Sequence, residues 1–407
     1  MSIDYGNVFD RMVRGTYEER EADWRNGAVV YQVLVDRFAP SADLEAKRHL
    51  YAAPKQLHAW NDVPTHGTYL ESEKLWSHEI DFWGGDLAST RERLQYIQDL
   101  GADVLYLNPI HLSYTNHGYD ALDYAAVKPE YGTRADVIAL AEALHERGMR
   151  LVLDGVFNHM GRNAPIFREA EADPASPYRE WFHFDPAIPG GARAWWRAEN
   201  LPELELEHPV VREHIYAGSD SIVRQYLREG IDGWRLDVAF DIGMTFLDEL
   251  TRAAHDEKPG SLIIGEIANY PKEWFPAVDG LLTFMTRDIL LRLVNGTIPA
   301  VHAQRLLARM YAEPGYEHLL KSWLYLDNHD TPRLATMVPD AKARAIAHVL
   351  QCTLPGSPNL YYGTELGMTG GDDPEMRAPM RWDLATDDNA SLQVTKRLLQ
   401  IRAQRRA

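Results

Sequence analysis

Short apolar segments alternate with longer amphipathic segments along most of the chain. The apolar segments are rich in Val, Ile, Leu and Tyr and have the length of buried strands, whereas the intervening segments follow the helical period. Eight strands are predicted, at 29–35, 104–107, 150–157, 233–238, 262–266, 280–284, 322–326 and 359–361. Helices are predicted between or after them, at 88–100, 134–147, 209–228, 342–352 and 392–405. Strands that alternate with helices are typical of a parallel sheet.

Eight such units predict a TIM (β/α)8 barrel with a small subdomain inserted after strand 3. The barrel is expected over 1–157 and 208–407, and the inserted subdomain over 158–207. A second long insertion, 39–79, follows strand 1. Because loops of this length are uncommon unless they are functional, the inserted subdomain is expected to wall a cleft.

The inserted subdomain is rich in aromatic side chains, which have two interpretations. They form the core of the subdomain, which is the commoner role, or they face the cleft and stack on a bound ring. The residues concerned are Tyr178, Trp181, Phe182, Phe184, Trp195 and Trp196.

Composition narrows the range of partners. The 407 residues include 42 Lys and Arg against 60 Asp and Glu, a formal net charge of −18. Nucleic acid and anionic membranes are therefore excluded as expected partners, because both require a basic face. The single cysteine, Cys352, lies in an apolar segment and indicates a buried thiol rather than a disulfide or zinc site. The first residues lack the features of a signal peptide, so a cytoplasmic protein is predicted.

Acidic side chains stand at the ends of three predicted strands. Asp237 ends Gly-Trp-Arg-Leu-Asp, Glu266 ends Leu-Ile-Ile-Gly-Glu, and Asp330 ends Tyr-Leu-Asp-Asn-His-Asp. Since the carboxyl ends of barrel strands meet at one face, we expect these carboxylates to lie together. Two carboxylates can cleave a glycosidic bond, one by attacking the sugar and the other by protonating the leaving oxygen. The pattern therefore favours glycosidic-bond chemistry.

Two arginines are expected to pair with neighbouring carboxylates. Arg235 precedes Asp237 by two residues, so both side chains point to the same side of the strand. The guanidinium is expected to lower the pKa of Asp237 and keep it ionised. Asp36 and Arg37, at the end of the first strand, are expected to form a structural ion pair at the barrel rim.

Eight segments, in order, resemble motifs of the α-amylase family of glycoside hydrolases over about residues 28 to 400. Within the family the chain is most similar to the cyclomaltodextrinase, neopullulanase and maltogenic amylase branch, on the segments 31–38, 234–239 and 370–380. The eight motif segments are 82–87, 106–110, 117–120, 154–159, 233–237, 265–266, 327–333 and 354–365.

The resemblance implies a role for each candidate residue. It implies that Asp237 is the nucleophile, Glu266 the general acid and base, and Asp330 the third acid, which binds sugar hydroxyls. Asp154 either supports the site from behind or touches the sugar. The implied substrate-binding residues are Tyr119 beneath the reacting ring, His159 and His329 as donors to hydroxyls, Arg235, and Asp373 and Arg377 on the next sugar.

Cofactors and metals follow from the same resemblance. No cofactor is expected to be required. The family's calcium site would use Asn158, and half of another calcium site resembles Gly84 and Asp86. Asp241 replaces a family histidine, and an aspartate can ligate calcium through oxygen. Calcium content is thus left open at this stage.

Departures from the family shape the expected substrate. Ala268 stands where this branch has Trp, and Phe240 follows the nucleophile motif where the branch has Asn. Short maltooligosaccharides or cyclodextrins, cleaved at α-1,4 bonds, are expected rather than long starch, and cleavage of α-1,6 bonds is left open. The N-terminal and C-terminal β-sandwiches of the family are expected to be absent, and the oligomeric state is left open.

Two alternatives remain at this stage. An α-glucosyl transferase or isomerase acting on sucrose, trehalose or maltose would use the same three acids and the same intermediate. A catalytically silent binding homologue would lack at least one of the catalytic residues, and Asp237, Glu266, Asp330 and Arg235 are all present.

Overall fold

The structure, a computed structural model, describes residues 5–196 and 198–404. Its centre is an eight-stranded parallel sheet in the order β12-β11-β10-β9-β6-β1-β14-β13. A parallel bridge between Leu282 and Trp323 joins the two end strands, so the sheet closes and the predicted TIM barrel is confirmed. The strands are β1 (Val30–Val33), β6 (Val104–Leu107), β9 (Arg150–Gly155), β10 (Gly233–Leu236), β11 (Leu262–Gly265), β12 (Gly280–Leu281), β13 (Trp323–Tyr325) and β14 (Ser357–Tyr361).

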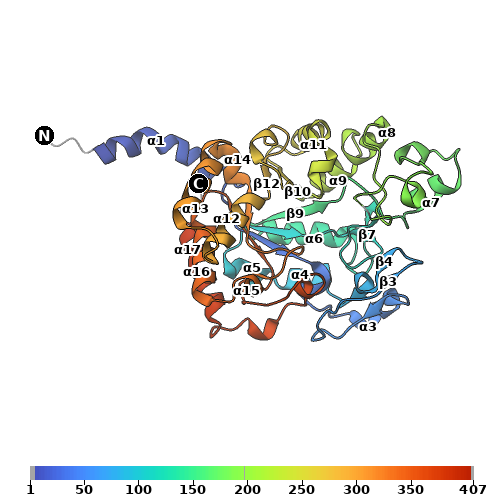
Figure 1. Ribbon diagram of the computed structural model, residues 1–407, viewed down its shortest axis with the longest axis horizontal. Helices are drawn as coiled ribbons and strands as arrows, with labels where there is room; N and C mark the ends of the chain where they lie inside the picture. The colour runs from blue at the N-terminus through green and yellow to red at the C-terminus, as the bar shows by residue number, and fades with distance from the viewer. Residues whose placement is uncertain (1–4, 197, 405–407) are drawn as a thin grey trace.

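Helices surround the strands (Figure 1). The longer ones are α1 (Tyr5–Ala22), α4 (Leu87–Glu92), α5 (Leu94–Leu100), α6 (Arg134–His145), α7 (Pro165–Ala172), α9 (Ile222–Arg228), α11 (Met244–Glu257), α12 (Phe284–Val294), α13 (Ala300–Ala312), α14 (Tyr316–Lys321), α16 (Ala341–Thr353) and α17 (Ala390–Arg402). The shorter ones include α2 (Val35–Phe38), α3 (Leu44–Lys47), α8 (Pro209–Arg212), α10 (Ala239–Ile242) and α15 (Leu334–Met337).

Two predicted helices are each divided in the structure. The prediction of one helix over 209–228 is wrong, because α8 leads into a π turn (Glu213–Ala217) and the backbone is extended at Gly218 before α9 begins. The helix predicted over 88–100 is divided into α4 and α5 at Arg93, whose backbone leaves the helical region. Hydrophobic period alone does not register such breaks, since the apolar face continues on both sides of them.

Several predicted strands end earlier than expected. The first strand ends at Val33, because residues from Val35 onward form α2. The strand predicted over 280–284 stops at Leu281, and Phe284 opens α12. The last predicted helix is α17, and the end predicted for it at residue 405 lies outside the described residues.

Side chains that point into the barrel form a separate apolar layer. Along a strand alternate residues face the barrel interior and the surrounding helices. The inner cluster contains Ala28, Val30, Val104, Tyr106, Val152, Leu262, Ile264, Leu282, Trp323 and Tyr325. This packed interior fixes the strand register, which in turn determines which side chains meet where the strands end.

Small elements of the two long insertions gather beyond the strand ends, on the right of Figure 1. The insertion after β1 contains α3 and the hairpin of β3 (Tyr69–Leu70) and β4 (Leu75–Trp76), and β2 (Gln56–Leu57) pairs with β5 (Asp81–Phe82). Another hairpin joins β7 (His111–Ser113) to β8 (Ala121–Val127). The segment 158–207 contains α7 and isolated bridges, and its division from the barrel as a subdomain stays a prediction.

The aromatic side chains of 158–207 fall into two groups, and stacking on a bound ring stays a prediction. Phe182 and Phe184 pack against Phe167 with ring centroids 4.9 Å and 5.6 Å away, which is a core arrangement. Trp195 and Trp196 instead line a cavity, and Trp196 is 83% exposed.

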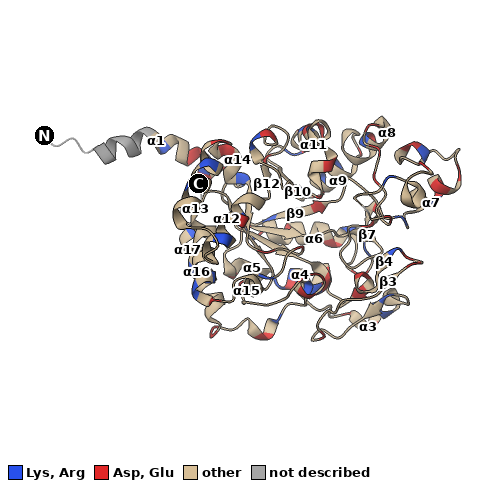
Figure 2. Ribbon diagram, in the orientation of Figure 1, with Lys and Arg blue, Asp and Glu red and all other residues tan. Residues whose placement is uncertain are grey.

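Basic and acidic side chains are interspersed over the outer helices (Figure 2). Within the described residues, no helix combines the length and the apolar character that crossing a membrane requires.

A buried ion pair fixes the loop after β1, as predicted. Arg37 Nε donates to Asp36 Oδ2 at 2.7 Å, and both side chains are almost fully buried. Asp36 also accepts the backbone N–H groups of Trp83 and Gly84 at 3.0 Å. The Arg37 guanidinium lies 3.8 Å from the centre of a Trp83 ring and donates to the carbonyl of Arg377 at 2.7 Å. The pair therefore ties three loops together at the carboxyl end of the barrel.

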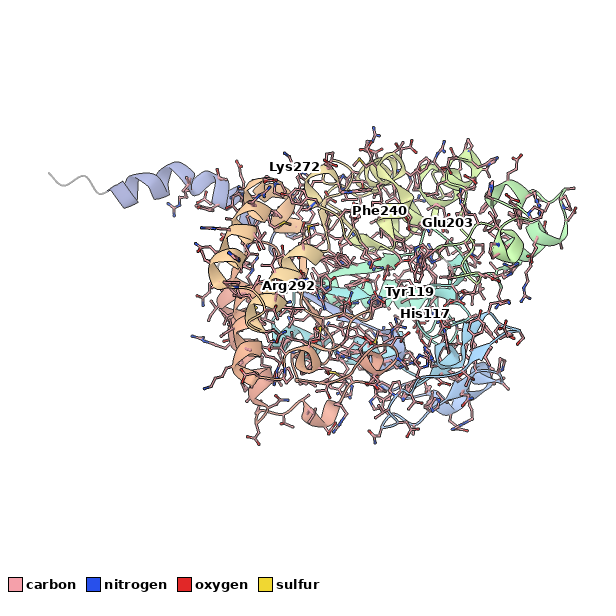
Figure 3. All side chains as sticks on the ribbon, viewed as in Figure 1. His117, Tyr119, Glu203, Phe240, Lys272 and Arg292 are labelled. Atoms are coloured by element: carbon pink, nitrogen blue, oxygen red, sulfur yellow. The ribbon has the colours of Figure 1, made fainter. Side chains whose placement is uncertain are left out.

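Replacing Arg37 by Met is predicted to destabilise the protein strongly. Asp36 would be left buried without a counter-ion, and breaking such a pair costs about 3–5 kcal/mol. The matched control is Arg292→Met, since Arg292 pairs with Asp288 on the exposed face of α12, away from His117 and Tyr119 (Figure 3). Thermal unfolding should show a much lower midpoint for Arg37→Met. The free energy of unfolding of Arg292→Met should differ from that of the wild type by no more than about 0.5 kcal/mol. Equal midpoints for the two variants would contradict this account.

Candidate active site

One buried guanidinium holds three carboxylates where the barrel strands end. Arg235 Nη1 donates to Asp154 Oδ1 at 2.7 Å and to Asp237 Oδ1 at 3.0 Å. Its Nη2 lies 2.9 Å from Glu266 Oε2. The strand register explains the cluster, because Arg235 on β10 lies directly beside Asp154 on β9. Asp237 follows Arg235 by two residues, so both point the same way.

The charge balance of this cluster corrects one prediction. Burial raises the pKa of Asp237 well above its ordinary value, and the Arg235 guanidinium opposes this effect without reversing it. The negative charges of Glu266 and Asp154 raise the pKa of Asp237 further. The expected net lowering of the Asp237 pKa is thus wrong, because one guanidinium is shared by several carboxylates. Interacting groups of this kind titrate as a unit, so the cluster retains a proton at higher pH than an isolated aspartate would.

A strained residue connects the nucleophile candidate to the acid candidate. Val238 has a φ of 47°, in the left-handed region that β-branched residues rarely adopt. In this conformation its N–H donates to Glu266 Oε2 at 3.0 Å. Such strain persists only where the surroundings enforce it and is concentrated at functional sites. The turn therefore places Glu266 beside Asp237, with both facing the same cavity.

Tyr119 lies across the floor of the site. Its hydroxyl donates to Asp154 Oδ2 at 3.0 Å and accepts from the amide of Asn108 at 3.0 Å. Its ring is nearly parallel to that of His329, with centroids 5.4 Å apart. Burial, with Arg235 and Arg377 nearby, holds the pKa of His329 well below its usual range. His329 is therefore neutral, and it lies behind Tyr119 rather than on the cavity surface.

His159 is also neutral and is placed beside Asp237. Burial lowers the pKa of His159 to about 4. The ring Nε2–H donates to the carbonyl of Tyr119 at 3.1 Å and lies 3.9 Å from Asp237 Oδ2. Because that carbonyl can only accept, Nε2 carries the proton. One face of the ring lies against Trp195, with centroids 5.8 Å apart. The one N–H of the neutral ring is thus engaged by the Tyr119 carbonyl, and the donation from His159 to a sugar hydroxyl stays a prediction.

Arg377 joins the third acid to the loop after β14. Its Nη2 donates to Asp330 Oδ1 at 3.3 Å, its Nη1 lies 3.2 Å from Asp373 Oδ1, and its Nε donates to the His329 carbonyl. Burial raises the pKa of Asp373, but Arg377 and His78 outweigh burial and hold that pKa well below its usual range. Asp373 is therefore an ionised acceptor at the cavity wall.

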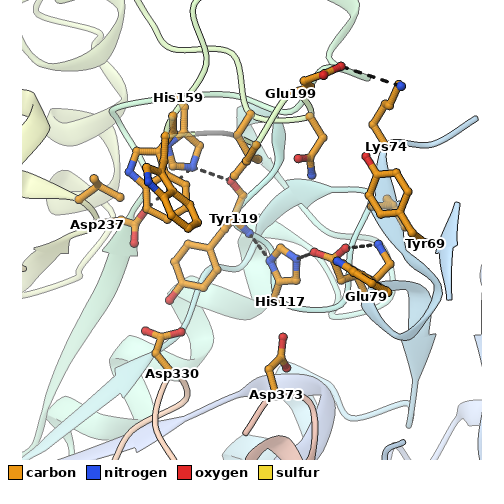
Figure 4. A pocket seen from close by; sticks show the side chains of 18 of the residues that line it. Tyr69, Lys74, Glu79, His117, Tyr119, His159, Glu199, Asp237, Asp330 and Asp373 are labelled. Carbon is orange, nitrogen blue, oxygen red and sulfur yellow. Dashed lines mark hydrogen bonds and ion pairs between the residues drawn. The ribbon is translucent and has the colours of Figure 1, made fainter. Parts of the chain in front are cut away.

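These side chains surround a cavity of about 610 Å³ (Figure 4). Seven predicted site residues line it, namely Tyr119, His159, Asp237, Glu266, Asp330, Asp373 and Arg377. Arg235 and His329, predicted to bind substrate, are instead buried behind the lining. Arg235 contacts the lining residue Asp237, and His329 packs against Tyr119. The structure thus brings the whole predicted set together, and the roles assigned to its members stay predictions.

Sequence reasoning expected the segment 158–207 to wall a cleft, with Trp196 as a candidate, but missed the other residues of one cavity wall. Residues from both long insertions line it, including Tyr69, Lys74, Trp76, Glu79, Trp196 and Glu199. His117 also lines it, and its Nε2 donates to Glu79 Oε1 at 3.1 Å. Irregular loops carry no period from which facing side chains can be predicted, although His117 stands in one of the family-like segments. These residues come from segments far apart in the sequence and meet only in the folded protein.

The donors at Gly84 and Asp86 do not fit a calcium ion. Asp86 Oδ2 accepts from the ammonium of Lys47 at 2.6 Å, and Asp86 Oδ1 accepts from the N–H of Ser89 at 2.7 Å as the N-cap of α4. The Gly84 carbonyl accepts from the N–H of Ser41 at 3.0 Å. A lysine ammonium thus already balances the carboxylate that a cation would need.

The predicted ligands near Asn158 are also engaged. The Asn158 carbonyl accepts from the N–H of Leu204 at 2.9 Å, and its side chain contacts His159. Asp241 Oδ2 accepts from Trp195 Nε1 at 3.2 Å. Among the residues described here, no group of three or more His, Cys, Asp or Glu side chains is arranged around a metal position. Calcium content stays a prediction, and the chemistry below assigns it no step.

A closed (β/α)8 barrel with paired carboxylates at its carboxyl end defines a protein of the TIM-barrel class with an enzyme-like site. Residues 32–406 match the alpha amylase catalytic domain, so the chain belongs to the α-amylase family.

Relatives place the chain in the predicted branch of this family. It is 31% identical to neopullulanase 2 of Thermoactinomyces vulgaris, over 93% of this chain and 63% of that protein. It is 32% identical to the cyclomaltodextrinase of Geobacillus thermopakistaniensis (strain MAS1), over 95% of this chain and 63% of that protein. The chain thus spans less than two thirds of the length of these relatives. A similar solved structure is the cyclic alpha-maltosyl-(1-->6)-maltose hydrolase of Arthrobacter globiformis, with a TM-score of 0.84 and 32% identity over 94% of this chain and 83% of that one.

Replacing Asp237 by Asn is predicted to stabilise the protein in a pH-dependent way. Below the ordinary aspartate pKa of about 3.9 the carboxyl is protonated in both states and the substitution changes little. As pH rises through the raised folded-state pKa, the wild type loses stability because ionisation is disfavoured in the folded state. The variant should therefore melt higher at pH 8, by at least about 3 °C, and the difference should vanish towards pH 4.

The exposed Asp388 provides the control for this experiment. Asp388→Asn should leave the melting midpoint almost unchanged at both pH values. An Asp237→Asn protein that melts below the wild type at pH 8 would show that the cluster does not strain the folded state.

Proposed function

We propose that the protein is a retaining α-glycoside hydrolase that cleaves α-1,4 bonds, and also α-1,6 bonds, in maltooligosaccharides, cyclodextrins or related short α-glucans. The observation that carries the proposal is the contact of one guanidinium, that of Arg235, with both Asp237 and Glu266 at the cavity. Retaining hydrolases need two neighbouring carboxyl groups at the cleaved bond, and the shared guanidinium keeps these two together.

In the first step, Asp237 attacks the anomeric carbon and forms a glycosyl ester. The bond to the leaving oxygen breaks with its electron pair, and that oxygen takes the proton of Glu266. This step needs one ionised and one protonated carboxyl group. Burial raises the pKa of Asp237, which favours retention of a proton within the carboxylate cluster. Because Asp237 is the proposed nucleophile, Glu266 is the group proposed to deliver the proton to the leaving oxygen.

In the second step, Glu266 takes a proton from water and the water oxygen attacks the anomeric carbon of the glycosyl ester. The ester bond breaks, its electrons return to Asp237, and the sugar leaves with its original α configuration. Asp330, paired with Arg377, accepts hydrogen bonds from sugar hydroxyls.

The substrate class follows from the cavity and from the relatives. Stacking of a sugar on Tyr119 and Trp195 would bury an apolar sugar face against an aromatic ring. Asp373 and Arg377 would hold the next sugar, as the resemblance implies. Structures of the Arthrobacter globiformis hydrolase include complexes with its cyclic sugar and with maltose. An oligosaccharide is thus the proposed partner of this chain.

A cytoplasmic location is part of the proposal. It is supported by 31% identity, over 94% of this chain, to a Bacillus subtilis (strain 168) protein named intracellular maltogenic amylase.

The test is product analysis with maltotriose, β-cyclodextrin, pullulan, sucrose and trehalose. Glucose or maltose should be released from at least one α-glucan, with the α-anomer appearing first by NMR. Asp237→Asn should lower this activity roughly 10⁴-fold, because the nucleophile is lost.

Two results would redirect the proposal. Rearranged sugars from sucrose or trehalose, without net hydrolysis, would identify a glucosyl transferase or isomerase. Release of the β-anomer first would exclude the double displacement.

A further inference from the structure

The two long insertions meet across one end of the active-site cavity. The ammonium of Lys74, at the tip of the β3–β4 hairpin, lies 3.9 Å from Glu199 Oε2 on the insertion after β9. It also lies 3.2 Å from Glu71 Oε2 within the hairpin. Figure 4 shows this cross-cavity contact above Tyr69, and all these residues except Glu71 line the cavity.

The hairpin side of this contact has a defined shape. Tyr69 stands opposite Trp76 in the register, and their rings pack edge to face with centroids 5.6 Å apart. Lys74 closes the four-residue loop with a φ of 57°, and the N–H groups of Glu73 and Lys74 donate to the Leu70 carbonyl. Cross-strand aromatic pairs of this kind stabilise a hairpin, so the side chain of Lys74 is presented from a formed element.

The opposite side is also held in place. Arg162 Nη1 donates to the Glu199 carbonyl at 3.2 Å, and the Arg162 N–H donates to the Asn200 carbonyl at 2.8 Å. Trp195, in the same insertion, is tied to the loop after β10 through Asp241. The loop that carries Glu199 is thus anchored at both the barrel and the insertion.

The direction of the substrate decides what this contact blocks. In Figure 4, Asp237 lies at one end of the cavity, Tyr119 lies between, and Tyr69 and Lys74 lie at the other end. Asp237 and Glu266 both contact Arg235 and mark the end where the bond is cleaved. The proposed function places Asp373 and Arg377, which also line the cavity, on the next sugar, on the far side of the reacting ring from the leaving group. The Lys74 end therefore receives the non-reducing side of the chain.

We propose that the β3–β4 hairpin and the Glu199 loop close the non-reducing end of the cavity, so that the enzyme acts on the free ends of linear α-glucans. The inference rests on the proposed hydrolase function and narrows its substrate class. A volume of about 610 Å³ lies within the about 300–1,000 Å³ of small-ligand pockets, and a long chain passing through would need an opening at both ends. An exposed ion pair is weak, so a single substitution at Lys74 or Glu199 is enough to separate the hairpin from the Glu199 loop.

The experiment compares two nitrophenyl maltooligosaccharides that differ only at the non-reducing glucose, one free and one blocked by a 4,6-ethylidene group. The wild type should cleave the free substrate with a kcat/KM at least about tenfold higher than the blocked one. Lys74→Gly and Glu199→Ala should bring this ratio towards one by admitting the blocked chain. Glycine adopts positive φ without strain, so Lys74→Gly keeps the hairpin.

Lys74→Arg is the matched control, because it keeps the charge and the reach of the side chain, and it should retain the wild-type ratio. Equal cleavage of both substrates by the wild type would overturn the closed end while leaving the hydrolase intact. An unchanged ratio in both Lys74→Gly and Glu199→Ala would show that these residues do not close it. Failure to cleave either substrate would instead overturn the proposed function, and the closed end with it.

Discussion

The buried guanidinium of Arg235 is the interaction on which the site depends. It is the only positive charge in direct contact with Asp154, Asp237 and Glu266 among the ion pairs of the described residues. Removing so many charges from water is costly, and their mutual attraction repays the cost only with good geometry. Burial raises the pKa of Asp237, and Arg235, which three carboxylates share, opposes this rise without reversing it. A raised carboxyl pKa favours retention of a proton, and general acid catalysis needs a proton at the site.

The barrel supplies that geometry through strand register rather than through loops. Arg235 and Asp154 are direct neighbours on β10 and β9, and Glu266 follows directly after β11. Loops add the other groups at the cavity, namely Asp330 and Arg377 after the last two strands and the two insertions that wall the cavity. A rigid sheet thus holds the reacting groups, while irregular segments determine which chain ends reach them. This division is common in TIM-barrel enzymes.

The sequence allowed prediction of the fold and of much of the site, for different physical reasons. Short apolar segments between helical ones predicted all eight strands, and acidic residues at their ends predicted which side chains converge. The pKa of Asp237 was predicted in the wrong direction, because burial and the neighbouring carboxylates follow from tertiary structure and not from the Arg-x-Asp spacing. The Lys74–Glu199 wall was missed because its two residues come from irregular loops 125 positions apart.

The central claim is that Asp237 becomes covalently bound to the sugar during each turnover. It is tested most directly by incubating the protein with 5-fluoro-α-D-glucosyl fluoride, a slow substrate of retaining α-glucosidases, and locating the adduct by peptide mass spectrometry. The account predicts one glucosyl unit on Asp237, and more of it in Glu266→Gln, because water is then no longer activated. An adduct on another carboxylate, or turnover of the fluoride with no adduct in either protein, would contradict it.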